Sequence, residues 1–176
     1  SFSQILPRDY TYEEAKVVMT EMALNGCLEL YRRHVITKRI WIGVGYSRDE
    51  IPGTHGTVRL KDATQLSSLI QPAVTAAYEA TAVRTVPIRR LAISFLDTCD
   101  EGCEGYDLFT DWNQIEREKT LERTVLEIRS RYGKNAVLRG INLDKAGTQK
   151  ERNEMIGGHR AGYDDERAAR ETVHAV

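Results

Sequence analysis

The stretch Thr37-Lys-Arg-Ile-Trp-Ile-Gly-Val-Gly-Tyr-Ser47 alternates apolar side chains with basic, small and hydroxyl-bearing ones. Side chains of a strand point to opposite faces in turn, so a period of two separates the residues into two sets. One set is apolar: Ile40, Ile42, Val44 and Tyr46. The stretch therefore predicts a strand with one buried face and one face toward solvent.

The segments on either side of this strand complete a pattern. In chain order they predict a strand over 1–6, a helix over about 12–33, strands over 37–47 and 54–62, a helix over about 65–81 and a strand over 88–96. This β-α-β-β-α-β order predicts an α+β fold, the ferredoxin-like sandwich, with a four-stranded antiparallel sheet and two helices on one face. The other face of the sheet is left open.

Local signals set the expected element ends. Thr11 and Glu14 form a capping box at the start of the first helix. Thr64 is expected to cap the second helix, and Pro72 to kink or split it. The first strand is expected to end before Pro7.

The chain changes character after the sandwich. The predicted division is a domain over 1–98, an acidic linker over 99–112, a helical C-terminal extension over 113–160 and a flexible tail over 161–176. Within the extension, a helix over about 114–132 is expected to be capped by Asn113 and to end at Gly133. Its apolar stripe is predicted as Leu121, Val125, Ile128 and Tyr132.

Composition excludes some classes of protein. The chain has 176 residues and a net charge of -1, with 25 basic and 26 acidic residues, so any nucleic-acid surface must be local. It shows no apolar run typical of a signal peptide or a transmembrane helix. The three cysteines are an odd count that favours a reducing cytoplasm, and the scattered histidines predict no metal site. Because the sequence opens at Ser1 in a strand-like run, we expect it to be a piece of a larger protein.

The solvent face of the sheet is the first candidate site. Alternation places on it Arg39, Trp41, Gly43, Gly45, Ser47, Thr57, Arg59, Lys61, Arg90 and Ser94, whereas Arg89 points the other way. Arginine and lysine neutralise phosphates, hydroxyls donate hydrogen bonds to them, and glycine permits close approach of a ligand to the backbone. The alternative is a solvated face whose charges only keep the sheet soluble.

The second candidate site is the peptide Gly105-Tyr106-Asp107-Leu108-Phe109 in the acidic linker. Two adjacent apolar side chains in a linker suggest a docking peptide that fits an apolar groove on a partner. The alternative is that they pack back onto the chain's own domain or third helix.

Several segments resemble the little finger domain of Y-family DNA polymerases, closest to the UmuC-like (ImpB/MucB/SamB) branch of Gram-positive bacteria. They are Ser1–Lys16, Glu21-Met22, Ile42-Gly-Val-Gly-Tyr-Ser47, Lys61-Asp-Ala-Thr64 and Pro87-Ile-Arg-Arg-Leu-Ala-Ile93. Arg131-Tyr-Gly-Lys-Asn135 and Arg152-Asn-Glu-Met-Ile-Gly-Gly-His159 resemble the C-terminal extension of that branch. The resemblance covers about residues 1–160.

This resemblance implies that the sheet grips primer-template DNA in the major groove. Arg89 and Arg90 match the family's DNA-contacting arginine pair, and Ser47 and Arg48 match strand-end positions that meet the template strand. Gly105–Phe109 stands where the family carries a Gln-Leu-x-Leu-Phe-type peptide that binds the sliding clamp. Here Gly105 replaces the glutamine, so the motif is degenerate.

The resemblance also implies that this fragment is not an enzyme. The carboxylates that hold catalytic Mg²⁺ lie in the family's palm, so we expect no catalytic residue and no cofactor here. The parent would be an error-prone translesion DNA polymerase of the DNA-damage (SOS) response, acting at the nucleoid in the bacterial cytoplasm. Two alternatives are a ferredoxin-like partner- or ligand-binding regulatory domain that does not contact DNA, and a small enzyme that uses His159.

Overall fold

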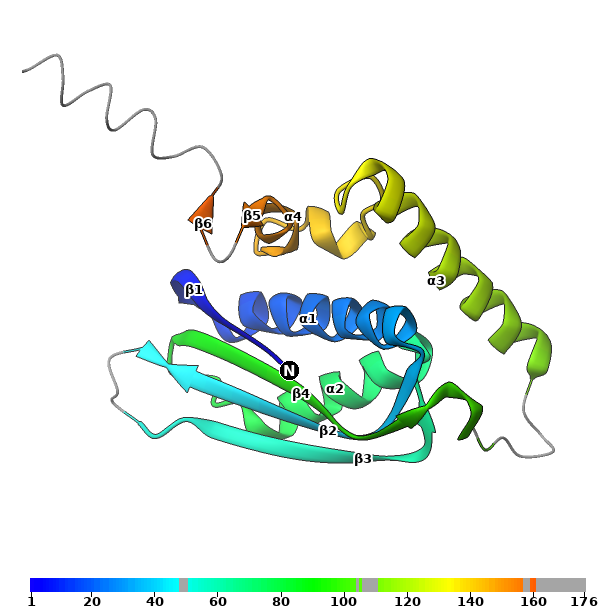
Figure 1. The fold of residues 1–176 in the computed structure, drawn as a ribbon. Coiled ribbons are helices and arrows are strands. Elements are labelled where there is room, and N and C mark those ends of the chain that lie inside the picture. Colours follow the sequence, from blue (N-terminus) through cyan, green and yellow to red (C-terminus); the bar gives the residue numbers. More distant parts are fainter. Residues whose placement is uncertain (48–50, 104, 106–110, 157–158, 161–176) are drawn as a thin grey trace, which may run out of the picture.

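The computed structural model describes residues 1–47, 51–103, 105, 111–156 and 159–160, and Figure 1 shows the fold. The elements of the sandwich are β1 (Phe2–Tyr10), α1 (Tyr12–Arg33), β2 (Val35–Tyr46), β3 (Thr54–Thr64), α2 (Ser67–Thr81) and β4 (Ile88–Asp100). They are followed by η2 (Glu101–Cys103), α3 (Trp112–Tyr132), η3 (Gly140–Leu143), α4 (Gln149–Asn153), β5 (Met155–Ile156) and β6 (His159–Arg160).

The four long strands form one antiparallel sheet in the order β1-β4-β2-β3. Because β1 and β2 are both antiparallel to β4, they run parallel to each other with α1 as their connection. In the same way α2 connects β3 to β4 across β2. Both helices cover one face of the sheet and leave the other face open (Figure 1). The predicted α+β sandwich with a helical extension is confirmed.

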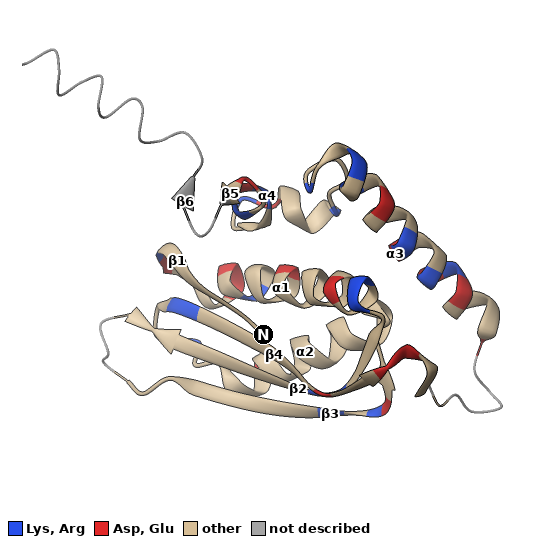
Figure 2. Ribbon diagram, in the orientation of Figure 1, with Lys and Arg blue, Asp and Glu red and all other residues tan. Residues whose placement is uncertain are grey.

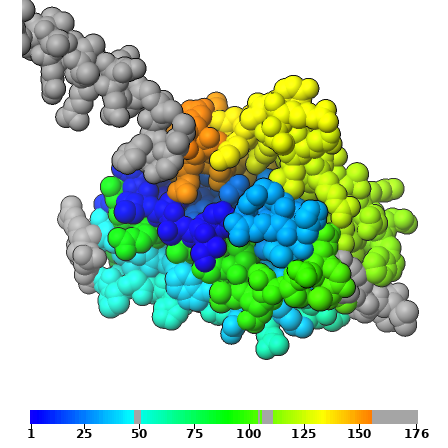
Figure 3. All heavy atoms as spheres, in the orientation of Figure 1, coloured from blue at the N-terminus to red at the C-terminus, as the bar shows by residue number. Residues whose placement is uncertain are grey.

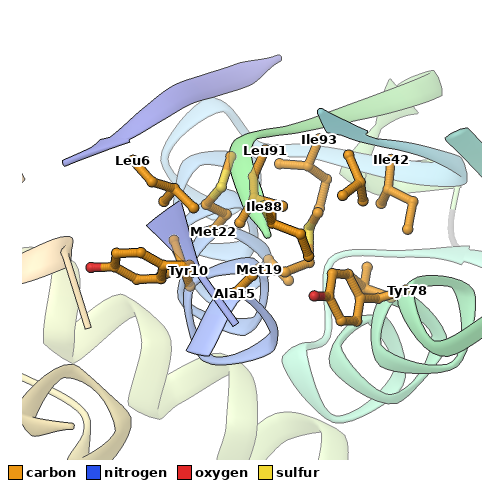
Figure 4. Packing of buried hydrophobic residues seen from close by; sticks show 14 of the residues in the cluster. Leu6, Tyr10, Ala15, Met19, Met22, Ile42, Tyr78, Ile88, Leu91 and Ile93 are labelled. Carbon is orange, nitrogen blue, oxygen red and sulfur yellow. The ribbon is translucent and has the colours of Figure 1, made fainter. Parts of the chain in front are cut away.

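The core lies between the sheet and the two helices (Figure 4). Tyr78 of α2 is fully buried there, and its hydroxyl donates a 2.9 Å hydrogen bond to the carbonyl of Tyr12. The apolar face of β2 predicted by alternation is buried as expected: Ile40, Ile42, Val44 and Tyr46. This burial fixes the strand register, because a slip by one residue would turn these side chains to solvent.

The first helix has the predicted bounds and the predicted cap. The Thr11 hydroxyl accepts a hydrogen bond from the Glu14 amide, and the Glu14 carboxylate accepts one from the Thr11 amide, at 3.3 and 2.9 Å. At the other end His34 adopts a left-handed conformation with φ of 55°, which ends the helix. Its amide donates to the Tyr31 carbonyl.

The prediction that the first strand ends before Pro7 is wrong. Strand β1 continues to Tyr10 through an irregularity between Ile5 and Tyr10 in its pairing with β4. Because β1 is an edge strand, a proline that lacks an amide hydrogen is tolerated there.

The N-terminal cap of the second helix differs from the prediction. Its N-cap is Leu66, without a side-chain hydrogen bond, and not Thr64. A carboxylate from another helix supplies the missing acceptor, since Glu118 of α3 accepts a 3.0 Å hydrogen bond from the Ser68 amide. Pro72 lies inside α2, and the helix continues through it from Ser67 to Thr81, so it is not split there.

The third helix begins earlier and buries a different side than predicted. Its cap is Asp111, whose side chain accepts from the Gln114 amide, and not Asn113. Gly133, with φ of 94°, ends it as expected. The predicted apolar stripe is wrong, because Leu121 and Tyr132 are 59% and 75% exposed. The buried residues of α3 are Ile115, Lys119 and Glu122.

The C-terminal elements form a further layer on the side of α1 that faces away from the sheet (Figure 1). Figure 3 shows this segment, yellow to orange, lying against the blue N-terminal elements. We call this contact, together with the Glu122–Arg139 pair inside the C-terminal segment, the C-terminal interface. Its polar contacts involve Gln4, Glu21, Ser67, Ser68, Glu118, Glu122, Arg139, Asn142, Thr148 and Gln149.

Glu21 of α1 lies at the centre of the C-terminal interface and is 1% exposed. Its carboxyl group accepts hydrogen bonds from Asn142 Nδ2 at 2.8 Å and from the amides of Thr148 and Gln149 at 2.7 and 3.2 Å. Gly147 lies so close that an added Cβ would stand 3.0 Å from Glu21 Oε1. A single buried side chain thus fixes the turn between η3 and α4. Among the described residues, no helix is both long enough and apolar enough to cross a membrane.

Candidate nucleic-acid interface

The strand register defines the open sheet face as a grid of side chains. Gly45, Gly43, Trp41 and Arg39 of β2 pair with Arg90, Ala92, Ser94 and Leu96 of β4. On the other side of β2, Gly43, Trp41 and Arg39 pair with His55, Thr57 and Arg59 of β3. Strand β1 adds Ser3 and Ile5 beside β4. These thirteen positions constitute the open sheet face and include no acidic residue.

Three arginines stand at two ends of the open sheet face. Arg39 forms a 2.9 Å salt bridge with Asp97, and both side chains are about half exposed, so the pair contributes little to stability. Within the described part of the chain, the side chains of Arg59 and Arg90 make no hydrogen bond or ion pair. Figure 2 shows the corresponding basic positions on β3 and β4. These two cations are therefore available to neutralise phosphates.

The two glycines of β2 are occupied by the chain's own side chains. A Cβ at Gly43 would lie 2.5 Å from Trp41 Cη2, and one at Gly45 would lie 3.0 Å from Arg90 Cβ. The indole of Trp41 and the stem of Arg90 thus use the close approach that glycine permits. The space above the two glycines is therefore filled by side chains of the same face and is not open to a ligand.

The strand-end residues have separate surroundings. The Ser47 hydroxyl donates a 2.9 Å hydrogen bond to Asp9, and its amide donates to the Pro87 carbonyl. Arg48 lies outside the described residues. Arg89 is the extra residue of a bulge, because Tyr46 pairs with Ile88 while Gly45 pairs with Arg90. A bulge re-aims side chains, so the alternation that turned Arg89 to the other face does not apply.

Lys61 lies apart from the other basic residues of the sheet. It is exposed on β3, in the irregular stretch between the pairs that Arg59 and Thr64 make with Arg39 and Thr37 of β2. It lines a cavity of about 270 Å³ between β3, the start of α2 and the first turns of α3. The structure therefore brings Arg39, Arg59 and Arg90 onto one face and sets Lys61 at its margin.

Of the linker peptide, only Gly105 is described, and it is exposed; Tyr106, Asp107, Leu108 and Phe109 lie outside the described residues. The clamp contact therefore stays a prediction from the sequence alone.

Two features of the molecule were missed by sequence reasoning. One is the contact between Trp41 and His55, whose ring centroids lie 6.3 Å apart with planes inclined by 26°. Alternation placed Trp41 on the face, but nothing in the sequence paired it with His55. The other is the buried carboxyl group of Glu21. A charge inside the apolar period of α1 was the signal that could have revealed it.

Comparison with known proteins relates this chain to one part of DNA-repair and DNA-polymerase proteins. The chain is 32% identical over 171 residues to a Bacillus subtilis protein named as the UV-damage repair protein UvrX. It is 28% identical over 156 residues to DNA polymerase IV 2 of Halalkalibacterium halodurans, and 27% identical over 157 residues to DNA polymerase IV 2 of Bacillus subtilis. The chain is homologous to one part of these proteins. No family model matches it.

The matches cover 88% to 90% of this chain but only 37% to 38% of each relative. They confirm the predicted resemblance to a segment of a Y-family polymerase. They also place the C-terminal layer within the homologous region, because about nine-tenths of the chain is aligned.

Proposed function

We propose that this chain is the DNA-gripping little-finger segment of an error-prone, translesion DNA polymerase. Its open sheet face would hold primer-template DNA through phosphate contacts. The observation that carries the proposal is that Arg59 and Arg90 have no partner among the described residues and lie on a face whose thirteen positions include no acidic residue. Such a face attracts a polyanion even though the chain's net charge is only -1.

Fluorescence anisotropy of a labelled primer-template duplex, titrated with salt, tests this proposal. Each phosphate contact contributes a slope of about -0.9 in the logarithm of affinity against the logarithm of salt concentration. A steep slope is expected. Absence of DNA binding at low salt would reject the proposal and would favour the alternative, a partner- or ligand-binding regulatory domain.

The variant Arg90→Glu should abolish DNA binding and leave the fold intact, because Arg90 is exposed. Arg117→Glu is the matched control. It makes the same change in net charge at an exposed position of α3, in the layer remote from the open sheet face. If both variants lose affinity equally, overall charge and not the face accounts for binding.

We further propose that this segment holds DNA and supplies no catalytic residue. Nucleotidyl transfer uses carboxylates that hold metal ions, and the parent protein would carry these, with Mg²⁺, in its palm. Such a parent would act on damaged DNA at the nucleoid of a bacterial cell. This division of labour predicts no polymerase activity from the isolated chain, measured by primer extension with Mg²⁺.

A sliding clamp is the second proposed partner, through the peptide Gly105–Phe109. The support is its Leu-Phe pair and its place between the sandwich and α3. Replacing both Leu108 and Phe109 by alanine should remove clamp binding in a pull-down and leave DNA affinity unchanged. Clamp binding that persists would place the docking peptide elsewhere.

A further inference from the structure

Trp41 presents a flat ring at the centre of the open sheet face. The six-membered ring of its indole lies over Gly43, where an added Cβ would stand 2.5, 3.2 and 3.1 Å from Cη2, Cζ2 and Cζ3. One side of the ring is therefore covered by backbone. The side chain remains partly exposed.

His55 extends this ring surface toward the edge strand β3. It is the cross-strand partner of Gly43, and its exposed imidazole is inclined by only 26° to the indole. The 6.3 Å between centroids is too long for full overlap, so the two rings are offset. We call the two rings the aromatic platform.

The neighbours of the aromatic platform are small. Thr57 and Ser94 flank Trp41 in its row, and Ala92 flanks Gly43 in the next. Nothing larger than a threonine stands beside the rings in these rows. A planar ligand can therefore reach them.

Cations stand at both ends of the platform. The row of Arg39 and Arg59 lies on one side, and the row of Arg90 lies on the other. The two rows are six residues apart along β2, which is roughly 20 Å at the rise of a strand. A ligand that crosses the platform would be charge-matched to the arginines if it carried negative charge on both sides of a flat apolar group.

A phosphate gains nothing from an aromatic face, and the bases of a duplex are already stacked on both sides. An unpaired base offers a free π-face, and stacking on aromatic side chains tolerates any base. We propose that the aromatic platform stacks unpaired bases of the template strand, while the flanking arginines bind its phosphates. This inference rests on the proposed DNA grip and assigns to it a single-stranded part of the substrate.

Fluorescence of Trp41 tests the inference directly. The chain has two tryptophans, so Trp112→Phe leaves Trp41 as the remaining one. Titration of this variant with a primer-template that has a 5′ single-stranded overhang should quench the Trp41 emission. A blunt duplex of the same length should bind with little quenching.

Affinities provide the second readout. Trp41→Val, which keeps a strand-forming residue, should weaken binding of the overhang substrate by about tenfold and leave blunt-duplex affinity and the salt slope unchanged. Trp41→Phe should restore most of the loss because it restores a ring. His55→Thr, at an exposed position, should give a smaller loss, and it keeps the test open if Trp41→Val does not fold.

Three outcomes would overturn the inference. The first is unchanged affinity of folded Trp41→Val for the overhang substrate. The second is an equal loss on the blunt duplex, which would assign Trp41 to packing of the sheet. The third is absence of binding to any DNA by the unaltered chain, and only this outcome rejects the proposed DNA grip as well.

Discussion

The open sheet face and the C-terminal interface differ in the surroundings of their charged side chains. On the open sheet face, Arg59 and Arg90 are unpaired within the described residues. In the C-terminal interface, Glu21 and Glu122 are each 1% exposed and are held by hydrogen-bond donors from distant parts of the chain. Burying a charge without a partner costs much free energy, whereas an exposed charge is solvated by water and costs little to leave unpaired. The proposed binding face thus leaves two cations without a partner among the described residues, whereas the C-terminal interface supplies donors to its buried carboxyl groups.

The comparison also explains why the two regions differ in composition. The sheet packs one face against the two helices, so its other face is free to carry residues for a ligand. The C-terminal layer has little apolar surface to bury, since the buried residues of α3 include Lys119 and Glu122. Hydrogen bonds to buried carboxyl groups therefore supply specificity where apolar packing is limited.

The largest effect is expected from removal of the Glu21 carboxyl group. Glu21→Ala leaves Asn142 Nδ2 and the amides of Thr148 and Gln149 without their acceptor. One buried and two partly buried donors at about 1–3 kcal/mol each should lower the free energy of unfolding by about 4 kcal/mol. Urea denaturation measures this, and limited proteolysis should show earlier cleavage after residue 133.

Two further variants of this test sharpen it. Glu21→Gln keeps one carbonyl oxygen and should cost less than half as much, while Glu116→Gln at an exposed site of α3 should change stability by less than about 0.5 kcal/mol. If Glu21→Ala unfolds at the same urea concentration as the unaltered chain, the C-terminal layer does not depend on this residue.

The next effect is expected at the pair of Glu122 and Arg139. Arg139→Met removes the ion-pair partner of a carboxylate that is 1% exposed, leaving it with the Ser67 hydroxyl at 3.4 Å. Stability should fall by about 3 kcal/mol. The double variant Glu122→Leu with Arg139→Met should recover most of this loss, because no buried charge remains. A double variant as unstable as the single one would show that the arginine acts through packing alone.

A smaller effect separates paired from unpaired arginines on the open sheet face. Arg59→Ala should reduce the slope of DNA affinity against salt by about 1, since it removes one phosphate contact. Arg39→Ala should reduce it less, because Arg39 already has Asp97 as a partner. Salt titrations by anisotropy compare them. Equal slopes for the two variants would mean that the Asp97 pair does not limit Arg39.

The sequence predicts the sandwich and the membership of its open face well, because one face of each strand is buried and the period is two. Arg39, Trp41 and Arg90 lie where alternation puts them. Prediction was wrong where a distant partner decides the local structure. Strand β1 passes Pro7 because it lies at an edge, and α2 is capped by Glu118, which is remote in sequence.

The same limit applies to the candidate site. Glycine at position 43 suggested access for a ligand, but the reason for it is the indole two residues away. Arg89 does not follow the alternation because it lies in a bulge, and the local sequence did not predict that bulge. The buried side of α3 follows partners such as Arg139 and not the apolar stripe. Periodicity reports which side is apolar, and it does not report which polar group has a partner.

The smallest effect concerns an exposed charge that already has partners, the Glu14 carboxylate at the start of α1. Its hydrogen bonds with the Arg8 side chain and with the Thr11 amide hold its pKa at about 2, below the ordinary 4.5. Because the folded-state pKa is lowered, the stabilisation is present above about pH 4.5 and is lost as the pH falls toward 2. Glu14→Gln should therefore cost about 0.5–1 kcal/mol at pH 7 and almost nothing at pH 2. Urea denaturation of both proteins across this range measures the difference. A difference in stability that stays constant with pH would show that the capping box acts through its geometry and not through charge.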